Sequence, residues 1–343
     1  MENRTEISAL GEFGLIDSIN RLFPLQSKET ILGIGDDAAV VSFENNQKTV
    51  VSTELLIEGV HFDLSYFPLK HLGYKTAVAG ISDIAAMNGI PKQILIGLGF
   101  SNRFSVEAVH ELYHGIRAAC DDFDIELIGG DTTASRSGLI ISITAIGAAD
   151  EHKIVKRTGA KENDIICVTG DLGASFLGLQ LLEREKAVFQ ANPNAQPDLD
   201  DYEYVISRQL KPSARMDIIH QLAELNVVPT AMIDLSDGLA SDLIQICKAS
   251  NVGATIFEDK LPIDDKSFLA ATELNLSPIT AALNGGEDYE LLFTISQSDF
   301  EKIKSISDVN PIGFVMAAKE KIQLMMTSGQ SVPLVAQGWN IGN

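Results

Sequence analysis

Residues 232–247 read MIDLSDGLASDLIQIC, a short apolar run, then a turn of small and acidic residues, then a second, interrupted apolar run. The first run, Met232–Asp234, predicts a buried strand, whereas the apolar side chains of 239–247 recur at the spacing of one helix face. A second segment has the same design, because Ile165–Thr169 leads through the turn at 170–175 into a helical pattern. A strand that turns directly into a helix is the repeating unit of α/β folds, so both segments predict that class.

The earlier part of the chain predicts another strand–helix series. Strands are expected over Thr49–Thr53, Gln93–Phe100, Glu126–Ile128 and Leu139–Ile146, and helices over Lys75–Met87 and Val106–Cys120. An amphipathic helix is also predicted between Leu15 and Phe23. The two series separate near Ala148–His152, so we expect two α/β domains, residues 1–149 and 150–343. The polar stretch Glu183–Tyr204 predicts an exposed connection or lid.

Composition narrows the class of protein. The 343 residues include 47 acidic and 26 basic side chains, a formal net charge of −21, which disfavours a nucleic-acid partner because such proteins need a basic surface. A signal-peptide pattern and an apolar run of membrane-spanning length are both absent from the sequence, so no membrane partner and a cytoplasmic location are expected. The cysteines Cys120, Cys167 and Cys247 are isolated, which predicts buried thiols rather than disulfides or a zinc site.

Three separate segments combine aspartate with glycine, serine or threonine. They read GIGDDAAV at 33–40, GGDTT at 129–133 and IDLSDGLAS at 233–241. Hard carboxylate and hydroxyl oxygens are the ligands that Mg²⁺ prefers when it bridges to substrate phosphates. Each segment alone is also explained by an ordinary turn or a helix N-cap. The repetition of one pattern three times favours a single multi-metal nucleotide site.

Asp83 adds a fourth carboxylate from a different setting. Its predicted helix, Lys75–Met87, is apolar on nearly every side, so the Asp83 side chain should be buried. A buried carboxylate needs a cation or hydrogen-bond donors, and Lys75 lies two helical turns away. A metal partner is therefore favoured over a structural hydrogen bond. In the predicted strand before it, Ser52 and Glu54 point to one face and Thr53 to the other, although a helix N-cap also explains the two hydroxyls.

Other catalytic signatures are missing. The sequence contains no GxxxxGK[ST] motif and no HRD or DFG set, which argues against P-loop and protein-kinase chemistry. No serine–histidine–aspartate arrangement stands out, and His61 alone is compatible with a structural role.

Taken in chain order, these segments resemble the thiamine-monophosphate kinase family, within the superfamily that includes aminoimidazole ribonucleotide synthetase and selenophosphate synthetase. The matching stretches are GIGDDAAV, SDIAAMNGIP from Ser82, LIGGDTT from Leu127, KRTGAKENDIICVTG from Lys156, SDGLASDL at 236–243 and GGEDYELLF at 285–293. The last two are the most specific to the kinase branch. The resemblance implies a two-domain aminoimidazole ribonucleotide synthetase-like α/β fold and a homodimer in which the N-terminal sheets pair.

The resemblance also implies an activity and its residues, carried over position by position. The activity is ATP-dependent phosphorylation of thiamine monophosphate to thiamine diphosphate with several Mg²⁺ ions. The implied metal ligands are Asp36, Ser52, Thr53, Glu54, Asp83, Asp131, Asp234 and Asp237. The implied ATP contacts are Tyr113, Gly130, Asp131, Arg157 and Ser236, and the implied substrate contacts are His61, Glu287 and Trp339. The first domain would bind ATP and Mg²⁺ and form the dimer, and the second would complete the nucleotide and substrate site.

Two positions depart from the family pattern. Glu54 stands where the family usually has aspartate, and its extra methylene moves the oxygens by over ~1 Å, so a water could mediate its metal contact. Asn340-Ile341-Gly342 follows Trp339 in place of the usual Asp-His-Phe.

The resemblance implies a reaction without a general base. The acceptor is a phosphate monoester whose second pKa is ~6, so it is largely dianionic near neutral pH. We therefore expect no catalytic acid or base, and expect positioning and metal electrostatics to provide the rate. Two alternatives remain at this point: an ATP-dependent cyclase of the same superfamily, and a non-catalytic protein that binds divalent metal.

Overall fold

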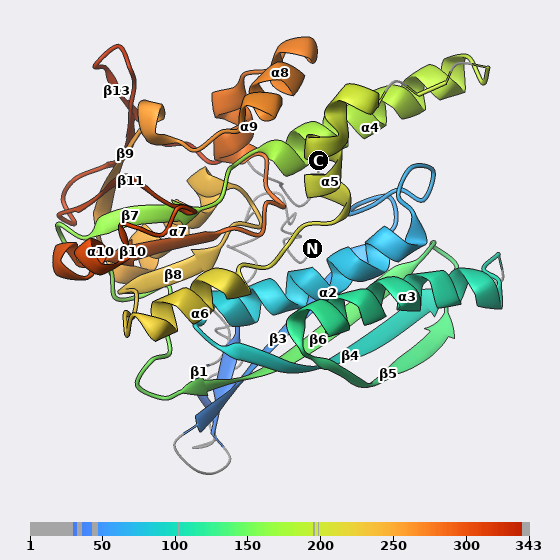
Figure 1. The fold of residues 1–343 in the computed structure, drawn as a ribbon, viewed down its shortest axis with the longest axis horizontal. Coiled ribbons are helices and arrows are strands. Elements are labelled where there is room, and N and C mark those ends of the chain that lie inside the picture. The colour runs from blue at the N-terminus through green and yellow to red at the C-terminus, as the bar shows by residue number, and fades with distance from the viewer. Residues whose placement is uncertain are drawn as a thin grey trace, which may run out of the picture.

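The computed structural model describes residues 30–32, 36–42, 47–101, 103–194, 196–197 and 199–337. Two sheets are arranged around helix α2 (Leu69–Ala86), which contacts β3, β4 and β6 of one sheet and β8 of the other (Figure 1). The helix predicted over 15–23 and the side chain of Trp339 lie outside the described residues.

The N-terminal sheet has six strands in the order β1-β2-β3-β6-β4-β5. Their bounds are β1 (Thr30–Leu32), β2 (Ala39–Val41), β3 (Gln47–Ile57), β6 (Ile140–Asp150), β4 (Ile90–Phe100) and β5 (Glu126–Ala134). All neighbours run antiparallel except β4 and β5, which are parallel. Buried and partly exposed residues alternate along β6, which is the period-two pattern of a strand with one covered face. Three of the predicted strands fall within β3, β4 and β5, and the fourth, predicted from Leu139, begins one residue before β6.

Helices α2 and α3 (Val106–Phe123) cover one face of this sheet, and Figure 1 shows no other described helix on the opposite face. Ser105 is the N-cap that precedes helix α3, and its hydroxyl accepts a hydrogen bond from the Ala108 N–H. Helix α2 is buried from Leu72 to Ala86, as its apolar pattern predicts. Despite this burial, none of the helices in the described residues combines the length and apolarity needed to cross a membrane.

The C-terminal sheet has seven strands in the order β13-β12-β9-β11-β7-β10-β8. Their bounds are β13 (Ser331–Pro333), β12 (Ile322–Met325), β9 (Gly253–Phe257), β11 (Val309–Met316), β7 (Ile165–Thr169), β10 (Leu291–Ile295) and β8 (Ala231–Asp234). The helices are α4 (Ala174–Ala191), α5 (Glu203–Leu210), α6 (Met216–Glu224), α7 (Leu239–Ser250), α8 (Asp265–Glu273), α9 (Pro278–Asn284) and α10 (Gln297–Ile303). Both strand–turn–helix units predicted from the sequence are present, as β7–α4 and β8–α7.

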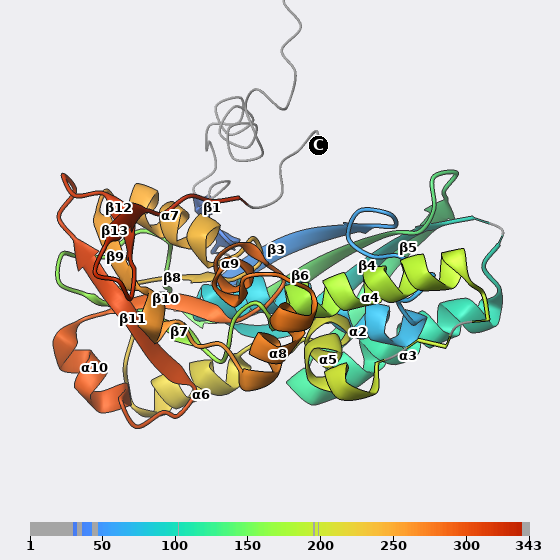
Figure 2. The same cartoon turned by 90° about the horizontal axis from the view of Figure 1, so that it is seen from above.

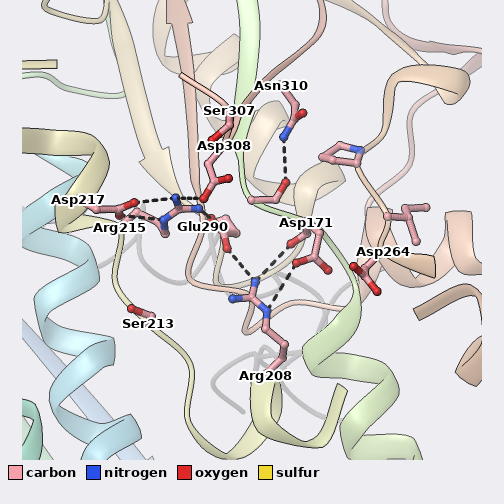
Figure 3. Close-up of a pocket in the computed structure, with 13 residues that line it drawn as sticks. Asp171, Arg208, Ser213, Arg215, Asp217, Asp264, Glu290, Ser307, Asp308 and Asn310 are labelled. Atoms are coloured by element: carbon pink, nitrogen blue, oxygen red, sulfur yellow. Dashed lines mark hydrogen bonds and ion pairs between the residues drawn. The ribbon is translucent and has the colours of Figure 1, made fainter. Parts of the chain in front are cut away.

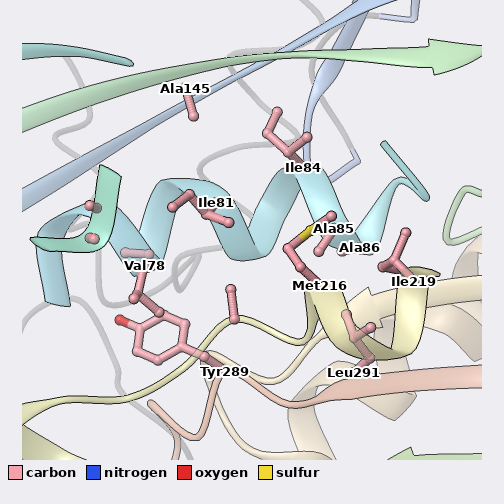
Figure 4. Close-up of a cluster of buried hydrophobic side chains, with 14 of the residues drawn as sticks. Val78, Ile81, Ile84, Ala85, Ala86, Ala145, Met216, Ile219, Tyr289 and Leu291 are labelled. Carbon is pink, nitrogen blue, oxygen red and sulfur yellow. The ribbon is translucent and has the colours of Figure 1, made fainter. Parts of the chain in front are cut away.

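One apolar cluster joins the two halves of the molecule (Figure 4). Ile81 and Ile84 of α2 belong to it, together with Ala145 of β6, Met216 of α6 and Leu291 of β10. Burying a side chain of this size contributes about 1.5–3 kcal/mol relative to exposure. Helix α2 is therefore held firmly between the two sheets, which matters because it carries Asp83.

Two segments differ from their predicted structure. Gly129–Thr133, interpreted as a turn, continues strand β5. It can do so because Gly130 lies against the Ile96 carbonyl of β4, where a Cβ atom would be only 1.9 Å from the oxygen. The stretch Glu183–Tyr204 is also not wholly irregular, because helix α4 continues to Ala191 and α5 begins at Glu203.

Helix α4 extends beside the N-terminal half of the molecule in both views (Figures 1 and 2). The Tyr66 hydroxyl donates to Glu183 Oε1 at 2.6 Å, and Lys186 Nζ donates to Asp63 Oδ2 at 2.7 Å. These contacts anchor the end of α4 on the loop that follows β3. The three cysteines are buried, as predicted, and their thiols are free in the structure.

Candidate active site

Three carboxylates from distant parts of the chain meet beside helix α2. Asp37 lies two residues before β2, Asp83 lies near the end of α2, and Asp234 is the last residue of β8. Each offers one carboxylate oxygen, and these oxygens lie within 4.8 Å of one another. They meet because α2 packs between β3 and β8. We call Asp37, Asp83 and Asp234 the carboxylate cluster.

The carboxylate cluster carries more negative charge than its surroundings compensate. Burial raises the pKa of Asp234 to about 8, with Asp37 adding to the effect. Burial likewise raises the pKa of Asp83 well above its ordinary value, and the charge of Asp234 raises it further. Arg157 opposes this through its Nη2, which donates to Asp37 Oδ1 at 2.5 Å. Crowded, desolvated carboxylates of this kind need a further cation to be ionised together.

Two hydroxyl groups orient the cluster. The Ser52 hydroxyl donates to Asp83 Oδ2, and the Ser82 hydroxyl donates to Asp234 Oδ2 at 2.6 Å. Ser82 precedes Asp83 on α2, and it is not among the residues singled out from the sequence. The sequence signal that could have identified Ser82 was its position directly before an aspartate on a helix predicted to be buried.

The raised pKa values give a testable pH dependence. A carboxyl group whose pKa is higher in the folded than in the unfolded chain binds more protons when folded, so stability falls as pH rises through that window. For Asp36 this pH window runs from the ordinary pKa of 3.8 to the raised pKa of about 6, and for Asp234 it runs from 3.8 to about 8. We expect the metal-free protein to lose stability as pH rises from near neutral toward 8, measured by thermal unfolding in chelator. Asp234→Asn should flatten the slope, and an unchanged slope would contradict the assignment.

The remaining predicted metal ligands of the first domain lie around the cluster or away from it. Asp36 accepts hydrogen bonds from the backbone N–H groups of Asp37 and Arg157 and lies beside the cluster, so the structure brings Asp37 rather than Asp36 into it. Glu54 is half-buried, and its charge contributes to the raised pKa of Asp83. Thr53 is exposed on the opposite sheet face, where its hydroxyl donates to the Ile143 carbonyl at 3.0 Å, as strand alternation predicts.

The turn after β8 supplies the remaining nearby groups. Asp237 is half-buried and Ser236 is exposed. The Asp237 N–H donates to Asp242 Oδ2 at 3.3 Å, and Asp242, which is 2% exposed, has a pKa raised first by burial and then by Asp237. Asp242 is a second residue that the sequence interpretation did not single out, although the aspartate at the first turn of α7 was visible in the motif.

Three predicted ATP residues lie elsewhere on the N-terminal domain. Asp131 pairs with Gly97 on β4, which pairs with Ser142 on β6, which in turn pairs with Leu55 on β3. Asp131 is therefore three strands away from β3. Because neighbouring strands lie about 4.8 Å apart, this corresponds to about 14 Å across the sheet. Gly130 precedes it on the same edge strand, and Tyr113 lines a pocket of about 810 Å³ between α3 and the start of β5. Within one chain, these residues are separated from the carboxylate cluster.

The predicted substrate residues His61 and Glu287 share one neighbourhood. Partial desolvation lowers the pKa of His61, the negative charge of Glu287 opposes that effect, and His61 Nδ1 accepts a hydrogen bond from the Ile57 N–H at 3.0 Å. Glu287 forms an ion pair with Lys75, with Nζ and Oε1 3.1 Å apart. Lys75 therefore pairs with Glu287 from the other domain rather than with Asp83 on its own helix. Trp339 lies outside the described residues, so its predicted role stays a prediction.

A second pocket, of about 580 Å³, is lined mostly by polar side chains, among them Glu290 (Figure 3). Glu290 is at its centre and accepts hydrogen bonds from Arg208 Nη2 at 2.8 Å and Arg215 Nη1 at 2.7 Å. Arg215 also contacts Asp217 and Asp308. Carboxylates of the protein already bind both guanidinium groups. These ion pairs therefore hold the α5–α6 segment against β10 and β7.

Comparison with known proteins identifies chains similar to this one along nearly their whole length. The AIR synthase related protein N-terminal domain matches residues 35–149, and the AIR synthase related protein C-terminal domain matches residues 161–319. The thiamine-monophosphate kinase of Bacillus subtilis (strain 168) is 33% identical, over 96% of this chain and 99% of that protein. The thiamine-monophosphate kinase of Aquifex aeolicus (strain VF5) is 35% identical, over 90% of this chain and 92% of that protein. A solved structure of AaThiL complexed with AMPPCP and TMP is 32% identical, with a TM-score of 0.83 over 99% of this chain and 100% of that chain.

Proposed function

The chain belongs to the thiamine-monophosphate kinase family, and we propose from this membership that it transfers the γ-phosphoryl group of ATP to thiamine monophosphate. The observation that carries the proposal is the carboxylate cluster, whose oxygens lie within 4.8 Å of one another between the two sheets. An excess of buried carboxylate suits an enzyme that must bring two phosphate-bearing anions together. The products are thiamine diphosphate and ADP.

The transfer is direct. A phosphate oxygen of thiamine monophosphate attacks the γ-phosphorus, and the bond from that phosphorus to the β–γ bridging oxygen breaks, so its electron pair leaves with ADP. The attacking phosphate is largely dianionic near neutral pH because its second pKa is ~6. No general base is needed, and the residues around the cluster position charge rather than move protons.

The residues fit the Mg²⁺ ions that this reaction implies. Asp37 Oδ2 and Arg157 Nε are buried and, among the described residues, have no hydrogen-bond partner. An unpaired carboxylate oxygen is the hard donor that Mg²⁺ takes, whereas the guanidinium suits an ATP phosphate. Asp37, Asp83 and Asp234 would hold the metal, with Asp36, Glu54 and Asp237 beside them. Bound Mg²⁺ supplies neutralisation of charge on the phosphate oxygens.

The active form is a homodimer in this proposal. The sheet face opposite α2 exposes Leu55 at 50%, and the edge strand β5 exposes Leu127 at 40% and Ile128 at 54%. Uncovered apolar surface of this kind is typical of a protein–protein interface. Pairing of two N-terminal sheets would cover it. Asp131 lies too far from the carboxylate cluster to act within its own chain, so the partner's edge strand would supply it.

The function is tested by incubating the protein with ATP, Mg²⁺ and thiamine monophosphate and separating the products by chromatography. We expect equal amounts of ADP and thiamine diphosphate, and no product when EDTA exceeds Mg²⁺, because the carboxylate cluster alone repels both substrates. Thiamine, which lacks the acceptor phosphate, is the matched control and should not react. ATP turnover without thiamine diphosphate would support a cyclase-like relative instead, and full activity in EDTA would overturn the metal assignment.

A further inference from the structure

Both carboxylate oxygens of Glu287 are held by buried side chains from other elements. Lys75 Nζ of α2 lies 3.1 Å from Glu287 Oε1, and Gln209 Nε2 of α5 donates to Glu287 Oε2 at 3.3 Å. Lys75 and Gln209 are each 1% exposed, whereas the Glu287 side chain is 29% exposed. The carboxylate is therefore fixed from behind and open on one side only.

The two holding groups are themselves fixed. Lys75 Nζ also donates to the Gln209 carbonyl at 3.2 Å and lies 5.4 Å from the centre of the Phe67 ring, so its ammonium group has three partners. The Gln209 amide oxygen accepts from the Ser175 hydroxyl at 2.5 Å, which turns the amide nitrogen toward Glu287. A lysine is rarely buried this completely without such pairing. The arrangement is specific to one position of Glu287.

The backbone around Glu287 is also constrained. Glu287 and Tyr289 have φ values of 57° and 53°, a left-handed backbone conformation that residues other than glycine seldom adopt. The Glu287 N–H donates to the Ser236 carbonyl at 2.8 Å, and the Tyr289 N–H donates to the Leu235 carbonyl at 3.0 Å. The loop that presents Glu287 is thus bonded to the turn that follows Asp234 of the carboxylate cluster.

We propose that Lys75 and Gln209 are positioning residues that fix Glu287 to accept a hydrogen bond from the exocyclic amine of the substrate's aminopyrimidine. The inference rests on the proposed function. A carboxylate has about four lone-pair sites, and two of those on Glu287 are occupied by Lys75 and Gln209. Because Lys75 neutralises the charge of Glu287, the site selects the amine by hydrogen bonding rather than the thiazolium by charge.

Helix α2 connects this recognition to the reaction. Lys75 and Asp83 are eight residues apart on one helix, which corresponds to about 12 Å along its axis. The helix is buried between the two sheets from Leu72 to Ala86, a stretch that contains both residues. A single rigid element therefore sets the separation between the group that holds Glu287 and a carboxylate of the phosphoryl-transfer site.

The test is Lys75→Met, which keeps the apolar stem and removes the charge. Steady-state kinetics should show KM for thiamine monophosphate raised about 10- to 150-fold, the loss expected for one charge-assisted hydrogen bond. KM for ATP and kcat should change little. The decisive readout uses an analogue in which a carbonyl replaces the exocyclic amine. Wild type should discriminate strongly against this analogue, and Lys75→Met should discriminate far less, which a merely structural lysine would not cause.

Two further variants keep the test decisive. Lys48→Met is the matched control, because Lys48 of β3 forms an ion pair at 2.7 Å with Glu151, away from Glu287. This variant should leave KM for thiamine monophosphate and KM for ATP unchanged. Gln209→Met leaves the Lys75–Glu287 ion pair in place, so it covers the case in which Lys75→Met does not fold, and it should also weaken discrimination. Wild-type discrimination in every folded variant would overturn the proposal. A wild-type protein that forms no thiamine diphosphate would overturn the proposed function and this inference with it.

Discussion

Asp83→Asn is expected to abolish phosphoryl transfer while the fold persists. Asp83 is 8% exposed and shares the carboxylate cluster with Asp37 and Asp234. Asparagine keeps the shape and can still accept the Ser52 hydrogen bond, but it removes the charge that would bind Mg²⁺. Loss of an outer partner of a metal ligand commonly reduces metal affinity or activity 10- to 100-fold, so loss of a direct ligand should reduce turnover by at least about 100-fold. Turnover is measured with saturating ATP and thiamine monophosphate.

Stability measurements separate this effect from misfolding. Without metal, Asp83→Asn should unfold at the same or a higher temperature than wild type, because one of the mutually repelling carboxylates has been neutralised. Added Mg²⁺ should raise the unfolding temperature of wild type but not that of the variant. Asp164→Asn is the matched control: Asp164 is 5% exposed and accepts hydrogen bonds from the Lys161 N–H and the Thr230 hydroxyl, away from the cluster. Near-normal turnover of Asp83→Asn would return Asp83 to a structural role.

The burial of Asp83 illustrates what the sequence can predict. A helix whose pattern is apolar on nearly every side has to be covered on nearly every side, and α2 is buried from Leu72 to Ala86. The alternation of Ser52 and Thr53 follows equally directly from strand geometry. In both cases the periodicity of one local element decides where a side chain points.

The partner of Lys75 illustrates what the sequence cannot predict. Spacing along α2 shows that Lys75 is two turns from Asp83, but its partner Glu287 comes from a loop in the other domain. Asp36 and Asp37 pose a related problem, because adjacent residues in a turn point in directions set by the turn's backbone, which composition does not specify. The structure is needed to select Asp37 for the cluster.

Asp131 shows a third limit, because a shared motif does not imply a shared location. GGDTT combines aspartate with glycine and threonine much as the other acidic segments combine it with glycine or serine, yet it lies on an exposed edge strand. Its residue Asp131 is paired, through Gly97 and Ser142, with Leu55 on the sheet face that points away from α2. If Asp131 binds ATP and metal, as proposed, the site must take it from a second chain.

Subunit complementation is therefore expected between Asp83→Asn and Asp131→Asn. Each variant alone should be inactive, because each removes one carboxylate from every site. The two chains are co-expressed with different affinity tags, and the heterodimer is purified through both tags. In a two-fold dimer that combines Asp83 of one chain with Asp131 of the partner, one site keeps both carboxylates and the other loses both, so activity should be about half that of wild type.

The opposite result has an equally clear meaning. If each site used Asp83 and Asp131 of the same chain, every site in the heterodimer would lack one carboxylate, and the preparation would stay inactive. The control is a doubly tagged dimer in which both chains carry Asp83→Asn, which should show no recovery. Leu55→Glu tests the same arrangement independently, because a charge on the 50% exposed outer-face leucine should prevent the sheets from pairing. Light scattering should then report a monomer, and that monomer should be inactive although its own carboxylate cluster is intact.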